Sequence, residues 1–212
     1  MERRIPQRPA LAHRTDPGRA DWVARAKEGD DEAFAMLVEA YQIPVFNLCL
    51  RMLGEPGEAE DAAQESFLRA YRGLARYDSE RPFGTWLLSI ASHYCIDQLR
   101  KRRLQFISVE EEMPAQMAAD THPGPEEALS LAQREEALSH LLAALAPQDR
   151  AAIVLRYWYD LSYAEIAAAL SLSVPAAKSR LHRARRLLAE RWGERQGGRT
   201  MMWRPTNEPS TI

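Results

Sequence analysis

The chain carries at residues 161–188 the stretch LSYAEIAAALSLSVPAAKSRLHRARRLL, which reads as two helices joined by a tight turn. Ser162 followed three residues later by Glu165 matches a capping box and predicts a helix start. The SLS at 171–173 interrupts the apolar pattern and ends on a second candidate N-cap, Ser173. Two short helices in this arrangement are typical of a helix-turn-helix motif.

The second helix of this stretch is predicted to bury one face and expose a cationic one. Apolar residues recur at steps of three or four and predict the buried stripe: Val174, Ala177, Leu181, Ala184 and Leu188. Between them lie the residues predicted to face a DNA groove, where arginine is the usual reader of guanine: Lys178, Ser179, His182 and Arg183. A further set is predicted to contact phosphates, which position a protein without specifying sequence: Arg156, Arg180, Arg185 and Arg186.

Charge is distributed unevenly along a chain of ordinary soluble composition. The 212 residues are 46% hydrophobic and 27% charged, with a formal net charge of −2, which argues against indiscriminate coating of nucleic acid. An acidic run occupies residues 55–65, and Arg100–Arg103 is a basic run. Separate acidic and basic surfaces indicate two kinds of partner, one of which is nucleic acid.

The same residues argue against catalysis, metal binding and membrane insertion. Cys49 and Cys95 lie in apolar helical patterns and are interpreted as core thiols, and the five histidines have no zinc-ligand spacing with them. No catalytic set or cofactor motif is recognisable, so binding is the expected activity. The N-terminal residues do not resemble a signal peptide, and no apolar run approaches the length of a membrane span, so a cytoplasmic protein is expected.

Helical periodicity without alternating strand patterns predicts an all-α protein of two small helical domains joined by a flexible linker. The expected organisation is a disordered arm at 1–20, a helical domain at 21–103, a linker at 104–125, a helix-turn-helix domain at 126–192, and a flexible tail at 193–212. Pro44 is expected to kink or restart its helix.

Two further surfaces are predicted in the first helical domain. An aromatic residue, polar groups and cations suit single-stranded DNA, whose bases stack on rings while cations hold the backbone: Tyr77, Ser79, Ser92, His93, Arg100, Lys101, Arg102 and Arg103. The helix at 58–74 exposes a mixed charged face: Asp61, Gln64, Glu65, Arg69 and Arg72. Its acidic end would repel phosphate, which favours a protein partner with a basic face.

Three segments in this order, DAAQESFLRAYRGL (61–74), RPFGTWLLSIASHYCIDQLRKRR (81–103) and PQDRAAIVLRYWYDLSYAEIAAALSLSVPAAKSRLHRARRLL (147–188), resemble bacterial RNA polymerase sigma factors of the extracytoplasmic-function (ECF) type. The resemblance implies a promoter-specificity subunit that melts promoters without ATP. Its implied partners are core RNA polymerase, at the clamp and flap regions, promoter DNA, and an anti-sigma factor.

The resemblance also assigns roles to positions of this chain. Asp61, Gln64, Glu65 and Arg69 match the clamp-binding positions. The loop at Tyr77 and the start of the next helix would capture the opened −10 strand, and the helix-turn-helix, with Tyr163 among its contacts, would read the −35 element. The linker would thread toward the RNA exit path of the polymerase.

Two other readings stay open on the sequence alone. A stand-alone helix-turn-helix regulator would bind duplex DNA tightly by itself, whereas a sigma factor needs core polymerase. A pure interaction protein would bind polymerase or a sequestering partner without DNA, and the cationic helix argues against it.

Overall fold

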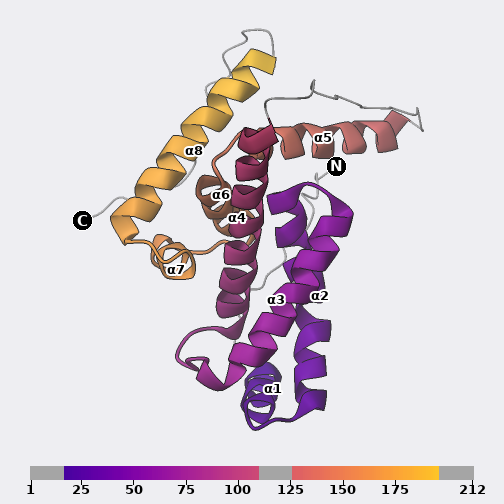
Figure 1. Cartoon of the computed structure of the whole chain (residues 1–212), viewed down its shortest axis with the longest axis vertical. Coiled ribbons are helices and arrows are strands. Elements are labelled where there is room, and N and C mark those ends of the chain that lie inside the picture. The colour runs from indigo at the N-terminus through magenta and orange to yellow at the C-terminus, as the bar shows by residue number, and fades with distance from the viewer. Residues whose placement is uncertain (1–16, 110–125, 196–212) are drawn as a thin grey trace, which may run out of the picture.

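The computed structural model describes residues 17–109 and 126–195, and every regular element in these two ranges is helical, which confirms the all-α prediction (Figure 1). The elements, in chain order, are α1 (Pro17–Lys27), α2 (Asp31–Leu53), α3 (Pro56–Gly73), the short 3-10 helix η1 (Leu74–Arg76), α4 (Phe83–Val109), α5 (Glu126–Ala143), α6 (Pro147–Trp158), α7 (Tyr163–Ala169) and α8 (Val174–Arg195).

The N-terminal half is a bundle built around α2, against which α1, α3 and α4 pack. Asp30 caps the start of α2 by accepting a hydrogen bond from the backbone N–H of Ala33 at 3.0 Å. Gly54 ends it at φ 86°, a left-handed conformation that glycine adopts without a Cβ penalty. Pro44 lies inside α2, which continues through it, so the chain does not restart there.

α2 has the length and mean hydropathy, 1.5, that a membrane span requires, and it is the one helix in residues 17–109 and 126–195 that does. Its apolar face, however, supplies the centre of the bundle. Leu37, Leu48 and Met52 are fully buried and pack with Leu87 and Leu88 of α4 in one hydrophobic cluster. Burial of this face accounts for the apolar character of the helix.

The helix-turn-helix forms as its sequence predicts. Ser162 Oγ accepts from the backbone N–H of Glu165 at 3.2 Å, and the Glu165 carboxylate accepts from the backbone N–H of Ser162 at 2.7 Å, so the capping box is complete. Ser173 caps α8 through the backbone N–H of Ala176. The predicted inward position of Val174 is wrong, because this first residue of α8 is 39% exposed.

Several predicted boundaries move by a few residues. α4 continues through Val109, so residues 104–109 are helical and not linker; α1 begins at Pro17 within the predicted arm; and α8 extends to Arg195. The remainder of the predicted arm, linker and tail, residues 1–16, 110–125 and 196–212, lies outside the described residues.

The two helical units share one hydrophobic core, which the sequence did not predict. α6 packs against both α2 and α4, α7 packs against α4, and α5 contacts α2 (Figure 1). Buried residues of both halves, from Leu48 of α2 to Leu155 of α6, belong to a single cluster. In this conformation, therefore, the helix-turn-helix unit is docked on the N-terminal bundle.

The capping box gives a direct test of the local fold. Replacing Ser162 with Ala should lower the free energy of unfolding by about 1 kcal/mol, the usual cost of a lost N-cap. Urea unfolding followed by circular dichroism measures this change. Ser179→Ala on the exposed face of α8 is the matched control and should stay within about 0.5 kcal/mol of the parent; equal losses in the two variants would contradict the capping role.

Candidate nucleic-acid and protein interfaces

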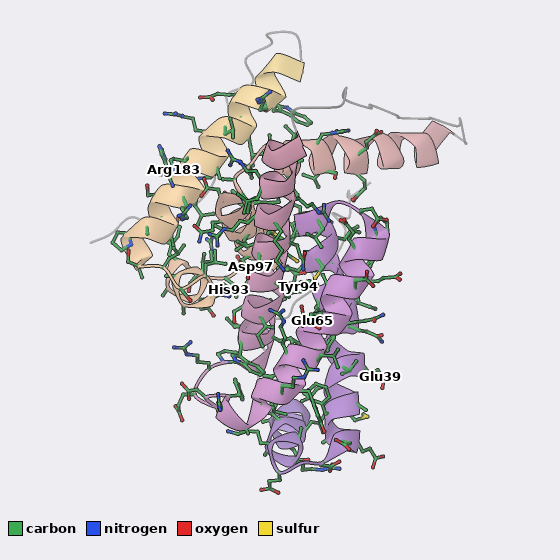
Figure 2. The ribbon with its side chains drawn as sticks, viewed as in Figure 1. Glu39, Glu65, His93, Tyr94, Asp97 and Arg183 are labelled. Carbon is green, nitrogen blue, oxygen red and sulfur yellow. The ribbon has the colours of Figure 1, made fainter. Side chains whose placement is uncertain are left out.

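The outward face of α8 gathers the residues predicted to read a DNA groove. Ala177, Leu181 and Ala184 are buried against the rest of the unit, which turns the intervening positions outward. All four predicted groove residues are exposed there: Lys178, Ser179, His182 and Arg183. Figure 2 shows Arg183 partway along α8, at the edge of the molecule, where a duplex can approach it.

Arg180 is tied to the core more closely than these neighbours, although Nη2 of the 58% exposed Arg183 also lies 3.9 Å from Asp149. Nη1 of Arg180 donates to Oδ1 of Asp149 at 2.8 Å, and these two side chains are only 25% and 14% exposed. Asp149 lies in the first turn of α6, so this ion pair fixes α8 on α6. The structure thus gives Arg180 a protein partner in place of the phosphate that the sequence predicted.

The remaining predicted phosphate contacts have different surroundings. Arg186 is exposed and lies 3.3 Å from Glu190 one turn later, whereas Arg185 is half-buried. Arg156 of α6 donates from Nη1 to the backbone carbonyl of Leu161 at 2.9 Å. Arg186 is therefore the freest of the flanking cations to reach a phosphate.

Tyr163, at the start of α7, gathers two cations around its ring. The Arg156 guanidinium lies 5.5 Å and the Lys178 ammonium 5.6 Å from the ring centroid, within cation–π range. This arrangement joins α6, α7 and α8 at one positive edge beside the groove-facing residues.

The loop between η1 and α4 is built on a buried tyrosine. Tyr77 is 6% exposed, its ring packs on Trp86 and Phe83 at centroid distances of 4.8 and 5.6 Å, and its hydroxyl donates to the carbonyl of Arg81. Burial raises the pKa of the phenol to about 12. The prediction that this ring is open to an unpaired base is therefore wrong for this conformation, in which Tyr77 supports the exposed residues 78–82 from beneath.

Lys27, at the end of α1, holds the same loop from the other side, and no pattern in the sequence indicated this role. Its Nζ donates to the backbone carbonyl of Tyr77 at 2.9 Å and to the hydroxyl of Ser79 at 3.2 Å. The ammonium also lies 5.7 Å from the centroid of the Tyr77 ring. These contacts cross fifty residues of sequence, so only the folded chain brings them together.

The predicted polar residues of α4 divide into exposed and buried positions. His93 is exposed, and its Nδ1 lies 2.9 Å from the backbone carbonyl oxygen of Ser89. Ser92 is completely buried, so its predicted contact with DNA is wrong for this conformation. Figure 2 shows His93 on the side of α4 that faces α7, and Tyr94 on the side that faces α3.

The basic run at the C-terminal half of α4 also separates into free and paired cations. Lys101 and Arg103 are exposed, and Arg100 is 54% exposed at 3.7 Å from Asp97. Arg102, in contrast, forms an ion pair with Glu58 of α3. Arg102 therefore joins α4 to α3, and the other three cations form the positive surface.

A shallow open pocket of about 230 Å³ lies beside this surface, between α3 and α4. Arg69 stacks over the ring of Tyr94 at 4.8 Å on its wall, and Asp97, Gln98 and Lys101 complete much of the lining. An aromatic ring, hydrogen-bonding groups and cations are the components that hold an unstacked base and its backbone.

The outward face of α3 presents the residues predicted to meet a protein. Asp61, Gln64 and Arg72 are exposed; Glu65 is half-buried and accepts from Nε of Arg69 at 2.8 Å. The structure adds two apolar residues that were not predicted, Leu68 and Tyr71, which are 50% and 47% exposed. Exposed apolar side chains within a charged rim are typical of a protein interface.

The two cysteines are structural. Both are free and fully buried, as predicted: Cys49 lies in α2 and Cys95 in α4. The interaction with the neighbouring Cys95 thiol, together with burial, raises the pKa of Cys49. Within the described ranges, no group of three or more His, Cys, Asp or Glu side chains is arranged to hold a metal ion.

Together, these surfaces define a helical protein with an exposed cationic helix, a second cationic surface beside a shaped loop, and a separate acidic and apolar face on α3. Comparison with protein-family models identifies the family to which this chain belongs. The model of sigma-70 region 2 matches residues 37–105, and that of sigma-70 region 4 matches residues 135–188. The chain belongs to the ECF sigma factors of the sigma-70 family.

Curated relatives are similar in sequence to this protein over most of its length. The ECF RNA polymerase sigma factor SigW of Bacillus subtilis is 36% identical over 173 residues, covering 78% of this chain and 92% of its own length. The RNA polymerase sigma-H factor of Pseudomonas aeruginosa is 36% identical over 171 residues, which cover 77% of this chain and 88% of that protein.

Solved structures share the fold. CnrH, in complex with the cytosolic domain of CnrY, matches with a TM-score of 0.63 and 24% identity over 84% of this chain and 98% of that one. The sigma factor RpoE of Bartonella quintana, in complex with the anti-sigma factor NepR, matches with a TM-score of 0.57 and 23% identity. The match covers 74% of this chain and 94% of that chain.

The different settings of Arg180 and Arg183 predict different consequences of substitution. Arg180→Met should lower the free energy of unfolding by about 1–2 kcal/mol, because it removes a charge-assisted hydrogen bond and leaves the Asp149 carboxylate, which is largely buried, without that partner. Arg183→Met should change it by less than about 0.5 kcal/mol. Urea unfolding of both variants measures the difference, and similar values would contradict the assignment of Arg180 to the α6–α8 contact.

Proposed function

We propose that the protein is a sigma factor that binds core RNA polymerase, recognises −35 and −10 promoter elements, and promotes promoter melting without ATP. The observation that carries this proposal is the order of three surfaces on one sigma-family chain. The acidic and apolar face of α3 is followed by a shaped loop and a cationic helix in region 2, and then by the exposed cationic helix α8 in region 4.

Duplex recognition is proposed for α8. Its exposed Lys178, Ser179, His182 and Arg183 enter the major groove, and Arg183 is assigned to a guanine edge because arginine is the usual reader of guanine. Arg186 and the cations around Tyr163 neutralise phosphates at the flank and set the register of the helix. The Arg180–Asp149 ion pair keeps the reading face at a fixed angle to α6.

Strand capture is proposed for the loop at 77–82 and the exposed side of α4. Arg100, Lys101 and Arg103 attract the backbone, and the pocket between Arg69 and Tyr94 offers a ring and polar groups to an unstacked base. Binding energy of the captured strand offsets the cost of unstacking, so melting needs no ATP. Lys27 and Tyr77 act as positioning residues, since they hold the loop and are not themselves open to the strand.

Polymerase binding is proposed for α3. Leu68 and Tyr71 supply an apolar centre, and Asp61, Gln64 and Glu65 supply an acidic rim that suits a basic partner surface. An anti-sigma factor is a further proposed partner, because RpoE of Bartonella quintana was solved as a complex with one. The clamp and flap of the polymerase remain the proposed contact sites, and the cytoplasm the proposed compartment.

The experiment that tests this function separates a sigma factor from a stand-alone regulator. Fluorescently labelled DNA carrying both promoter elements is titrated with the purified protein, alone and with core RNA polymerase, at one fixed salt concentration. Specific binding that requires the core enzyme is the expected result. Equally tight, sequence-specific binding by the protein alone would overturn the proposal and favour the stand-alone regulator.

Charge reversal on α3 should separate polymerase binding from DNA binding. Asp61→Lys with Glu65→Lys should reduce affinity for core polymerase at least tenfold, because like charges across an interface repel. Affinity is measured by fluorescence anisotropy at low salt. The control pair Glu28→Lys with Glu136→Lys makes the same charge change at exposed positions on α1–α2 and α5; if it weakens binding equally, net charge and not the α3 face is responsible.

Loss of the Lys27 contacts should impair melting. Lys27→Met is expected to slow open-complex formation on duplex promoter about threefold to tenfold, because the loop loses two charge-assisted hydrogen bonds. The effect should be smaller on a template with a pre-melted −10 region, and Lys27→Arg should restore much of the rate. Arg76→Met is the control; equal defects on both templates would show that Lys27 affects stability and not strand capture.

A further inference from the structure

We propose that Asp149 of α6 is a positioning residue for duplex recognition. Its carboxylate holds the Arg183 guanidinium on the exposed face of α8, so that part of the guanidinium stays free to bind a base. The inference deepens the proposed function and rests on it, because the base contact of Arg183 belongs to that proposal. The hold of Asp149 on Arg183 in the free protein, however, rests on the contacts of this chain alone.

Asp149 supplies an anion at a defined place beside α8. It lies in the first turn of α6, where the helix dipole favours a negative charge, and α6 packs directly on α8. The side chain is only 14% exposed, so its carboxylate needs nearby donors to compensate for the water it has lost. Cations on the adjacent face of α8 are placed to provide this compensation.

Two arginines of α8 meet the same oxygen of this carboxylate. Nη1 of Arg180 donates to Oδ1 of Asp149 at 2.8 Å, and Nη2 of Arg183 lies 3.9 Å from that oxygen. The two arginines are three residues apart in one helix, which places them side by side on its surface. Arg180 is 25% exposed and completes the contact with α6, whereas Arg183 is 58% exposed and keeps much of its side chain in solvent.

The ion pair leaves part of the Arg183 guanidinium available to a base. A guanidinium is planar and carries five N–H donors, so a carboxylate beside one nitrogen leaves other donors for O6 and N7 of a guanine. A free arginine side chain loses rotamer freedom when it binds a base, and an ion pair that restricts the side chain beforehand reduces this loss. Asp149 therefore strengthens the base contact without touching DNA itself.

The carboxylate also changes the balance between base contacts and phosphate contacts. Attraction of a cation to the DNA backbone is independent of sequence, and a negative charge beside Arg183 offsets part of that attraction. The contact with a base edge depends on the direction of the N–H donors, which the ion pair helps to fix. Asp149 should therefore raise the preference for one base pair more than it raises affinity for DNA in general.

The first test measures the order of the Arg183 side chain in the full chain without DNA. Its Nε–Hε signal is identified by its loss in Arg183→Met, and the heteronuclear NOE of that signal reports motion on the picosecond-to-nanosecond scale. The NOE should be high in the parent and fall in Asp149→Asn, which keeps the size of the side chain and removes its charge. Equal values in the parent and Asp149→Asn would overturn the inference, whether or not the chain binds polymerase.

Arg180→Met is the matched control, because it removes the 2.8 Å pair with Asp149 and leaves the contact between Asp149 and Arg183 in place. The NOE of Arg183 should stay at the parent value in this variant. Asp149→Glu, which keeps the charge, should retain more of the order than Asp149→Asn. An equal fall in Arg180→Met and Asp149→Asn would show that packing of α8 on α6, and not the ion pair, orders the side chain, and would overturn the inference.

The second test uses the holoenzyme formed with core RNA polymerase. Its affinity is measured for promoter DNA and for variants in which one −35 base pair at a time is changed, at one fixed salt concentration. Arg183→Met should remove a preference of at least about fivefold at one G·C pair. Asp149→Asn should reduce the preference at that same pair about twofold to fivefold, the range for one exposed ion pair, and Arg180→Met should keep it.

The pattern across base pairs separates positioning from stability. Asp149→Asn combined with Arg183→Met should lose no more preference at that pair than Arg183→Met alone. If Asp149→Asn weakens binding to every −35 variant equally, its role is structural and the inference is overturned. A parent holoenzyme without any −35 preference would instead contradict the proposed function, and the NOE of the free chain would still decide whether Asp149 holds Arg183.

Discussion

Packing of the inner face of each helix determines which charges can meet a partner. In α8, the small residues Ala177 and Ala184 allow close approach to the rest of the unit, and the Arg180–Asp149 ion pair fixes the angle of the helix on α6. Because this inner face is fixed, Lys178, His182 and Arg183 are exposed on the opposite side of α8. The same constraint sets the acidic and apolar face of α3, whose buried alanines pack on the bundle. The function proposed for these surfaces therefore depends on the core.

The shared core stabilises the contact between the two helical units. Burial of α6 against α2 and α4 protects apolar surface that two separated domains would expose. Separation of the two units would expose this surface, so any partner that separates them must supply binding energy to offset that exposure. Arg150 and Tyr159 of α6 donate hydrogen bonds to the backbone carbonyls of Met52 and Pro44 in α2, and these two buried contacts favour one docked arrangement.

Local patterns in the sequence predicted much of the fold and of the recognition helix. The capping box at Ser162, the second cap at Ser173 and the apolar stripe of α8 depend on residues within one or two turns, and the structure confirms them, except at Val174. The contacts of Lys27, Arg102 and Arg150 could not be predicted in this way. Their partners lie far away in sequence, and no periodicity indicates which cation pairs internally and which meets DNA.

The measurement that tests the central claim most directly is run-off transcription on a library of genomic promoter fragments, with purified core polymerase in the presence and absence of this protein. The account predicts transcripts that depend on the protein and start downstream of two shared sequence elements. Measurable core binding without any protein-dependent transcript would contradict the proposed function, because the chain would then bind polymerase without directing it to promoters.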